Sequence, residues 1–254
     1  MTSATTALAN VSLDDKYALE KGRVFLTGTQ AMVRLPMLQR QRDQAAGLNT
    51  GCYISGYRGS PLGAFDQQLW QAKPFLEKNH IVFQPGVNED MAATAVWGSQ
   101  QLNLGPQSKY DGVYGIWYGK APGVDRCGDV VRHANHAGTD PNGGVLMMCG
   151  DDHAAVSSTV PGQSEHNLAS WMVPMLYPAG VQEYLDYGLL GWAMSRYAGV
   201  WVGFKCVSEV VESSASVDVD AHRLDIQYPD FEMPEGGLNI RWPDDRWSQE
   251  IRLQ

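Results

Sequence analysis

Short apolar segments alternate with amphipathic segments of helical length through most of the chain. Strands are predicted over residues 23–27, 52–56, 80–84, 112–118, 144–150, 175–177 and 200–206. Helices are predicted over residues 28–47, 64–79, 88–104, 125–137, 163–172 and 181–197. The run 144–150 contains five apolar residues without alternation, which is typical of a strand buried on both faces. This alternation predicts an α/β fold, a doubly wound and mainly parallel sheet with helices on both faces.

Proline and capping residues refine two of these helices. Pro36 should kink or restart the helix at 28–47, and Pro74 should interrupt the helix at 64–79. Asn88 is a good N-cap, and Glu89 then falls in the first turn, where the helix dipole favours an acid. Complementing the dipole explains Glu89 on pattern alone. The functional alternative is a buried carboxyl group that shares a proton with a heterocycle.

The pattern divides the chain into three parts. Residues 1–19 form a polar N-terminal extension, residues 20–212 the α/β domain, and residues 213–254 a linker followed by a truncated start of the next segment. The N-terminus lacks the basic and apolar regions of a signal peptide. The most apolar stretch, residues 188–204, is broken by Ser195-Arg196 and is too short for a membrane span. We therefore expect a cytoplasmic protein, and the abrupt stop of the tail suggests a fragment.

Charge and cysteine content exclude several classes of protein. The 254 residues include 19 Lys and Arg against 28 Asp and Glu, a net charge of −9. Such a chain, without a basic cluster, is a poor candidate for binding nucleic acid or an anionic membrane. The four cysteines lie far apart and no C-x-x-C occurs, so neighbouring cysteines cannot build an iron–sulfur or zinc site.

Gly, Pro and charged residues concentrate in the loops that follow the predicted strands. Ligands of open α/β sheets bind at this carboxyl edge. The loop Gly-Tyr-Arg-Gly-Ser-Pro-Leu-Gly at 56–63 lacks the Gly-Lys-Ser/Thr of a phosphate loop and the glycine spacing of a dinucleotide site. Its Arg58 could bind a carboxylate or could simply be solvated.

A second set of polar residues lies between residues 120 and 153. Its members are Lys120, Arg126, His133, His136, Asp151, Asp152 and His153. His133 and His136 share a helix face and could bind a metal with Asp151 or His153, as in a hydrolase, but the spacing is not H-E-x-x-H. Satisfied or solvated histidines are the simpler interpretation, and we expect no metal site. Gly150-Asp151-Asp152 also resembles the start of a magnesium–diphosphate loop, without the glycine that such a loop has at the third position.

Four stretches, taken in order, resemble one family. They are KGRVFLTGTQAMVRLPMLQRQRD, SGYRGSPLGAFD, PGVNEDMAATAVWGSQ and GGVLMMCGDDHAAVSSTVPGQSEHN, and the tail GGLNIRWPDD also fits. They resemble the N-terminal region of the long, fused indolepyruvate ferredoxin oxidoreductases, a branch of the thiamine-diphosphate-dependent 2-oxoacid:ferredoxin oxidoreductases. The resemblance covers nearly the whole chain and implies a thiamine-diphosphate-binding fold of the pyrimidine type.

The resemblance also implies roles for particular residues. In such domains a glutamate at the start of a helix hydrogen-bonds a ring nitrogen of the aminopyrimidine, and Glu89 matches that position. Tyr57, Arg58 and Ser60 match the loop that lines the cofactor and substrate mouth. Lys120 and His133 match a polar segment near the active site, so the predicted substrate pocket is Arg58, Lys120 and His133.

The implied reaction is oxidative decarboxylation of indolepyruvate or another arylpyruvate-type 2-oxoacid to acyl-CoA, with coenzyme A as acceptor and electrons passing to ferredoxin. Thiamine diphosphate would be shared with a second domain in a dimer. Magnesium and the iron–sulfur clusters would belong to regions missing from this chain, which we therefore expect to be inactive alone. The alternative from the residues is a non-catalytic domain that binds a partner chain, and the distant one is the hydrolase described above.

Overall fold

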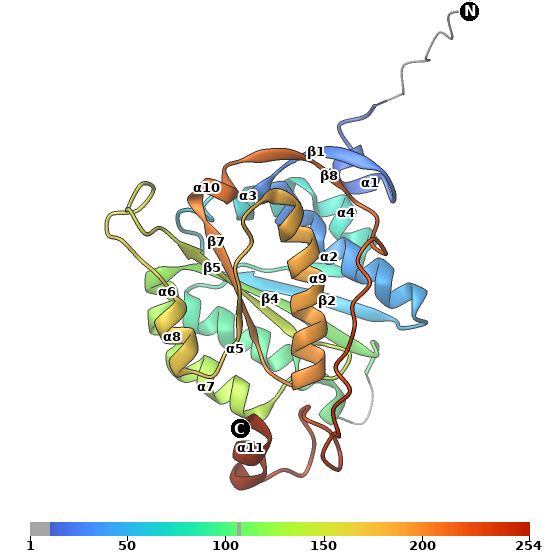
Figure 1. Cartoon of the computed structure of the whole chain (residues 1–254), viewed down its shortest axis with the longest axis vertical. Helices are drawn as coiled ribbons and strands as arrows, with labels where there is room; N and C mark the ends of the chain where they lie inside the picture. The colour runs from blue at the N-terminus through green and yellow to red at the C-terminus, as the bar shows by residue number, and fades with distance from the viewer. Residues whose placement is uncertain (1–10, 106–107) are drawn as a thin grey trace, which may run out of the picture.

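A parallel sheet with helices on both faces forms the centre of the molecule (Figure 1). The computed structural model describes residues 11–105 and 108–254. Within these residues, six strands pair in the order β3-β2-β4-β5-β7-β6, and every pair is parallel. The strands are β2 (Thr50–Gly56), β3 (Ile81–Phe83), β4 (Gly112–Lys120), β5 (Val145–Asp151), β6 (Met175–Leu176) and β7 (Val202–Val207). The predicted fold class is confirmed.

Alternate residues of the strands build two hydrophobic clusters, one under each layer of helices. One layer contains α2 (Gly28–Ala45), α3 (Phe65–Gln71), α4 (Lys73–Lys78) and α9 (Val181–Ala198). The other contains α5 (Glu89–Ser99), α6 (Ala121–Arg126), α7 (Gly128–Ala137) and α8 (Glu165–Ser170). Short elements complete the chain, namely α1 (Asp15–Ala18), the 3-10 turn η1 (Leu102–Leu104) and α10 (Ser208–Val211). In β4, Tyr118 faces the first layer and Trp117 the second, because side chains alternate along a strand.

Local signals in the sequence explain where the helices begin and break. Helix α2 runs without restarting through Pro36, whose carbonyl accepts a hydrogen bond from the Tyr114 hydroxyl at 2.7 Å. Pro74 lies in the first turn of α4, where a missing N–H is tolerated, and the predicted interruption is confirmed. Asn88 caps α5 by accepting a hydrogen bond from the Met91 amide at 2.9 Å, also as predicted.

The strand predicted at 23–27 forms outside the main sheet. As β1 (Arg23–Thr27) it pairs antiparallel with β8 (Ser214–Asp218), so the main sheet has six strands and not seven. Residues of β1 alternate between exposed and buried, which suits a two-stranded ribbon with one face on the core. At the end of the ribbon the chain packs tightly, since a Cβ at Gly28 would lie 2.3 Å from the Val210 carbonyl oxygen.

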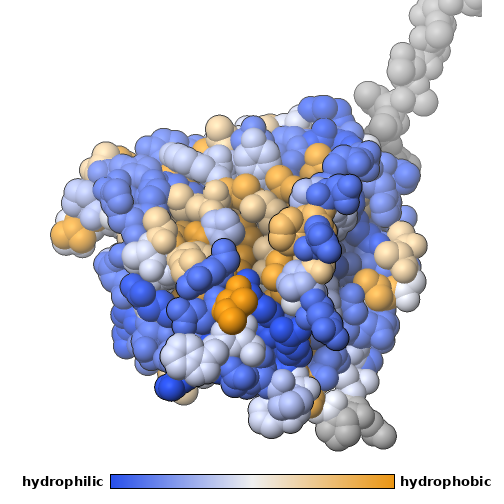
Figure 2. All heavy atoms as spheres, turned by 60° about the horizontal axis from the view of Figure 1, so that its bottom comes forward, coloured by the Kyte–Doolittle hydropathy of each residue, from blue (hydrophilic) through white to orange (hydrophobic). Residues whose placement is uncertain are grey.

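After β8 the chain runs down the outside of the α2 and α9 layer (Figure 1). The Arg42 guanidinium holds this segment by donating to the carbonyls of Ala221 at 2.8 Å and Leu224 at 3.0 Å. The chain ends in α11 (Arg246–Leu253), which packs against α7. Figure 2 brings this end forward and shows apolar surface bounded by hydrophilic residues. Among the described residues, no helix combines the length and apolar character needed to cross a bilayer.

Candidate functional site

The strand order places a topological switch point at the carboxyl edge of the sheet, between β2 and β4. After β2 the chain leaves toward β3 on one side, whereas after β4 it leaves toward β5 on the other. Loops that diverge from neighbouring parallel strands leave space for a ligand above those strands. The carboxyl edge of β2 and β4 is therefore where the predicted site residues are best placed to act.

Glu89 lies at this edge as the first residue of α5. The residue is 8% exposed, and its carbonyl accepts a hydrogen bond from the Trp117 indole Nε1 at 3.1 Å. Its side chain rests on Gly123 of α6, where a Cβ would lie 2.7 Å from Glu89 Cγ and 2.9 Å from Oε1. Only glycine fits at position 123 without moving the carboxylate. The helix-dipole interpretation and the functional one both agree with this placement.

Arg126, the last residue of α6, lies beside Glu89 and Asp90. Its Nη1 is 3.5 Å from Glu89 Oε2, whereas Nε and Nη2 each lie 2.8 Å from Asp90 Oδ2. The next residue, Cys127, is buried against the same two acids, and burial raises the pKa of its thiol. Beside this thiol, the corner contains two carboxyl groups and one guanidinium.

The loop at 57–63 crosses the ends of two further strands. Its first amide, of Tyr57, donates to the Tyr118 carbonyl at 3.0 Å. A Cβ at Gly59 would lie 2.8 Å from the Lys120 side chain. A Cβ at Gly150, on β5, would lie 3.1 Å from both Pro61 and Leu62. The loop that carries Tyr57, Arg58 and Ser60 therefore packs beside Lys120 at the end of β4.

A buried acid lies beneath that loop. Asp66, in α3, is 3% exposed, and burial raises the pKa of its carboxyl group, while the Tyr118 hydroxyl and Arg58 act in the opposite direction. Burial also raises the pKa of Tyr118. Asp66 Oδ1 has no hydrogen-bond partner, so the loop covers a polar group that is not fully satisfied. No motif in the sequence singles out Asp66.

His133 and His136 lie on α7, away from this set. His133 Nε2 is 3.6 Å from Asp129 Oδ1 one helical turn earlier, and its ring stacks on Trp97. Its side chain is 65% exposed. Neither histidine contacts Asp151, so the contacts found in the structure do not assemble the metal ligands of the hydrolase alternative. The structure also does not bring His133 to Arg58 and Lys120.

A second charged cluster lies at the carboxyl edge, and the sequence patterns singled out only Asp151 and His153 of its members. Lys205, on β7, is fully buried, and its Nζ contacts His153 Nε2 at 2.6 Å, Asp151 Oδ2 at 3.4 Å and Glu165 Oε1. Ser164 donates to Asp151 from its amide at 2.9 Å and from its hydroxyl at 2.6 Å. Burial lowers the pKa of Lys205, and Asp151 opposes that change.

This cluster has the composition of a metal site but already contains a cation. In the described part of the chain, Asp151, His153 and Glu165 are the one group whose ligand atoms all lie within 4.8 Å of one another. The Lys205 ammonium contacts each of them and supplies the positive charge that they need. A lysine within a buried strand requires partners of opposite charge. Lys205 in the predicted strand 200–206 is therefore the sequence feature from which the cluster could have been predicted.

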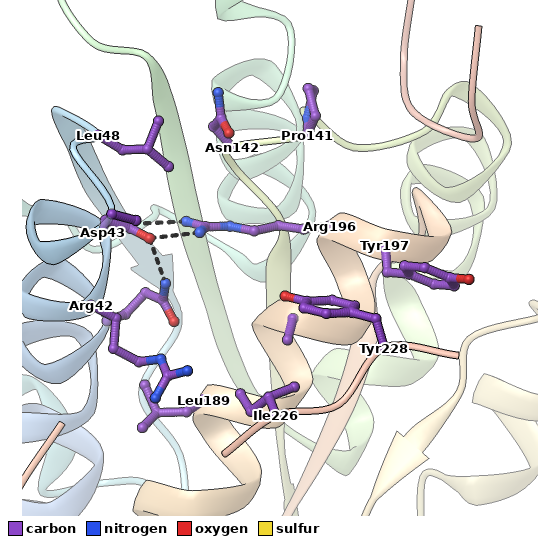
Figure 3. Close-up of a pocket in the computed structure, with 13 residues that line it drawn as sticks. Arg42, Asp43, Leu48, Pro141, Asn142, Leu189, Arg196, Tyr197, Ile226 and Tyr228 are labelled. Atoms are coloured by element: carbon purple, nitrogen blue, oxygen red, sulfur yellow. Dashed lines mark hydrogen bonds and ion pairs between the residues drawn. The ribbon is translucent and has the colours of Figure 1, made fainter. Parts of the chain in front are cut away.

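The hollow shown in Figure 3 lies at the opposite, amino edge of the sheet. It measures about 410 Å³ and lies between the ends of α2 and α9. Arg196 binds both carboxylate oxygens of Asp43, at 2.7 and 2.9 Å, and Asp43 also accepts from Gln39 at 2.8 Å and Thr50 at 2.6 Å. The charges of Arg196 and Asp43 neutralise each other. Thr50 is the first residue of β2, which places this ion pair at the amino edge of the sheet. The hollow is therefore held by a structural ion pair and lies at the edge of the sheet opposite Glu89.

Comparisons with known proteins agree with the fold. One solved structure that matches is a 2-oxoglutarate:ferredoxin oxidoreductase from Magnetococcus marinus, with 2-oxoglutarate, coenzyme A and succinyl-CoA bound. The TM-score is 0.55 at 15% sequence identity, and the match covers 77% of this chain and 31% of that chain. No family model matches the chain, and neither does any curated protein sequence.

The chain therefore has a doubly wound α/β fold, of the kind found in the matching oxidoreductase. It spans less than a third of the length of that chain. An identity of 15% establishes the architecture alone, so activity and substrate are argued from the site.

Proposed function

We propose that this chain is the pyrimidine-binding domain of a thiamine-diphosphate-dependent 2-oxoacid:ferredoxin oxidoreductase. The observation that carries the proposal is the position of Glu89. Its carboxylate is pressed against Gly123 at the carboxyl edge of the sheet, and its side chain keeps 11% of its surface exposed. The ordered motifs in the sequence and the shared architecture support the same interpretation.

The residues at the edge suit an aminopyrimidine. Glu89 offers one carboxyl group to a ring nitrogen. Gly123 has no side chain, so it leaves room for this carboxyl group and packs directly against it. Bound thiamine diphosphate would supply the carbon nucleophile that decarboxylates a 2-oxoacid. The chain's own part is to hold a proton at the Glu89 carboxyl and to orient the ring, while the Trp117 indole fixes the Glu89 backbone.

The loop at 57–63 and Lys120 would form the substrate side of the site. Arg58 is exposed and Lys120 half-buried, and both carry charge that can bind the carboxylate of a 2-oxoacid. Tyr57, 41% exposed, offers an aromatic surface to an arylpyruvate side chain, which makes indolepyruvate the proposed substrate. Tyr57 and Ser60 complete the mouth. His133 has no part in this arrangement because its contacts are with α5 and α7.

A partner module would complete the site. Several large apolar side chains are exposed on loops or helix starts at the carboxyl edge, namely Tyr57, Val87, Met91, Val156, Val160 and Tyr177. Exposed apolar groups clustered on one edge are typical of an interaction surface. We propose that they meet the domain that binds the diphosphate and magnesium, in a dimer. Coenzyme A, ferredoxin and the iron–sulfur domains would act on the assembled enzyme.

Replacing Glu89 by Gln in the complete enzyme tests the proposal. Glutamine keeps the size of the side chain but cannot exchange the proton, so indolepyruvate-dependent reduction of a viologen dye should fall about 10²- to 10⁴-fold. Glu77→Gln, on the exposed face of α4, is the matched control and should keep its rate. An unchanged rate for Glu89→Gln would remove the assignment and favour the non-catalytic partner-binding alternative.

A further inference from the structure

Arg126 makes two unequal contacts at the start of α5. Two of its nitrogens lie 2.8 Å from Asp90 Oδ2, but only Nη1 approaches Glu89, at 3.5 Å. The guanidinium is thus anchored on Asp90 and reaches Glu89 with its remaining arm. Within the described part of the chain, Arg126 is the one cation that pairs with Glu89.

The surroundings make this contact displaceable. The Arg126 side chain is 50% exposed, whereas that of Glu89 is 11% exposed and is confined by Gly123. When a ligand approaches, the exposed partner can move and the confined one cannot. Asp90, 34% exposed, can keep Arg126 attached to α5 while Nη1 leaves Glu89.

We propose that Arg126 is a positioning residue for Glu89. It holds the Glu89 carboxyl group in position at the carboxyl edge until a ring nitrogen of an aminopyrimidine takes its place, and Asp90 retains the displaced guanidinium. This inference rests on the proposed function. Arg126 therefore competes with the ring, and Asp90 limits that competition by drawing the guanidinium toward itself.

The first experiment needs no cofactor. The Trp117 indole N–H donates to the Glu89 carbonyl, so its NMR resonance reports the position of Glu89. Arg126→Gln should shift this resonance, whereas Arg132→Gln, a matched change on α7 that contacts Ser170, should not. Arg126→Lys keeps the charge and should restore part of the wild-type shift. In a Glu89→Gln background, Arg126→Gln should leave the Trp117 resonance unchanged.

The second experiment measures binding of thiamine diphosphate with Mg²⁺ to the complete enzyme. A half-exposed ion pair contributes little, so Arg126→Gln should lower the Kd by about 1.4- to 5-fold. Asp90→Asn frees the guanidinium to pair with Glu89 and should raise the Kd by a similar factor. The double variant should match Arg126→Gln alone, because Asp90 acts only through Arg126.

The outcomes separate the two proposals. If Glu89→Gln does not change the Kd, the proposed function fails. If Glu89→Gln weakens binding but Arg126→Gln changes neither the Trp117 resonance nor the Kd, the role of Arg126 is overturned and the proposed function stands. A weaker affinity in Arg126→Gln would also overturn it, since the guanidinium would then be helping the ring to bind.

Discussion

Adding one methyl group beneath Glu89 is the sharpest perturbation of the site. In Gly123→Ala, the new Cβ would lie 2.7 Å from Glu89 Cγ and 2.9 Å from Oε1, closer than nonbonded atoms tolerate. The Glu89 side chain must move, because the clash is with its middle carbon and not only with its end. A misplacement of about 1 Å in a catalytic group costs about 10²-fold in rate.

The stability of this variant should change much less. Overpacking costs about 1 to 3 kcal/mol, but alanine is favoured over glycine in a helix by about 1 kcal/mol. The net loss is therefore about 0 to 2 kcal/mol, or a fall in Tm of up to about 8 °C for a domain of this size. The assays are thermal unfolding of the chain and indolepyruvate-dependent dye reduction by the complete enzyme.

Gly98→Ala is the matched control. Gly98 lies in α5, the same helix as Glu89, but a Cβ there would meet nothing within 4 Å. This variant should be more stable by up to about 1 kcal/mol and fully active. Wild-type activity in Gly123→Ala would refute the reasoning, because it would mean that the confined position of Glu89 is irrelevant to turnover.

Three further changes test the charges around the site. Lys205→Met leaves the buried Asp151 carboxylate without its cation and should cost about 3 to 5 kcal/mol in urea unfolding, whereas Lys73→Met on the surface should cost little. Burial raises the pKa of Asp66 in the folded protein, so the protonated carboxyl group stabilises the fold at low pH, and this stability is lost as pH rises through the raised pKa. Asp66→Asn should make the free energy of unfolding less dependent on pH between pH 4 and 7. Arg196→Met leaves the buried Asp43 carboxylate without its cation at the amino edge. It should lower stability by about 3 kcal/mol without changing the Kd for thiamine diphosphate.

Most of the sheet could be predicted from local patterns, and the exception has a physical cause. Apolar runs, prolines and the Asn88 cap act within a few residues, so the strands and the breaks in the helices follow from them. The strand at 23–27 has the right local pattern as well, but its partner β8 is nearly 190 residues away. Which sheet a strand joins depends on that distant pairing, and hydrophobic periodicity does not encode it.

The candidate site, like the sheet, could be predicted from the sequence only in part. Glu89 could be placed at the start of a helix from its cap, and the loop at 57–63 from its glycines and proline. The close approach of Gly123 to Glu89, and the buried Lys205 cluster, arise where separate strand–helix units meet. His133 was assigned to the pocket by motif position, but its helix turns it toward Trp97.

A structure of the complete enzyme with thiamine diphosphate bound would test the central claim most directly. The account predicts a Glu89 carboxyl oxygen within about 2.6 to 3.2 Å of a ring nitrogen of the aminopyrimidine, with Arg126 still bound to Asp90. An aminopyrimidine bound elsewhere, with Glu89 still paired to Arg126, would contradict it.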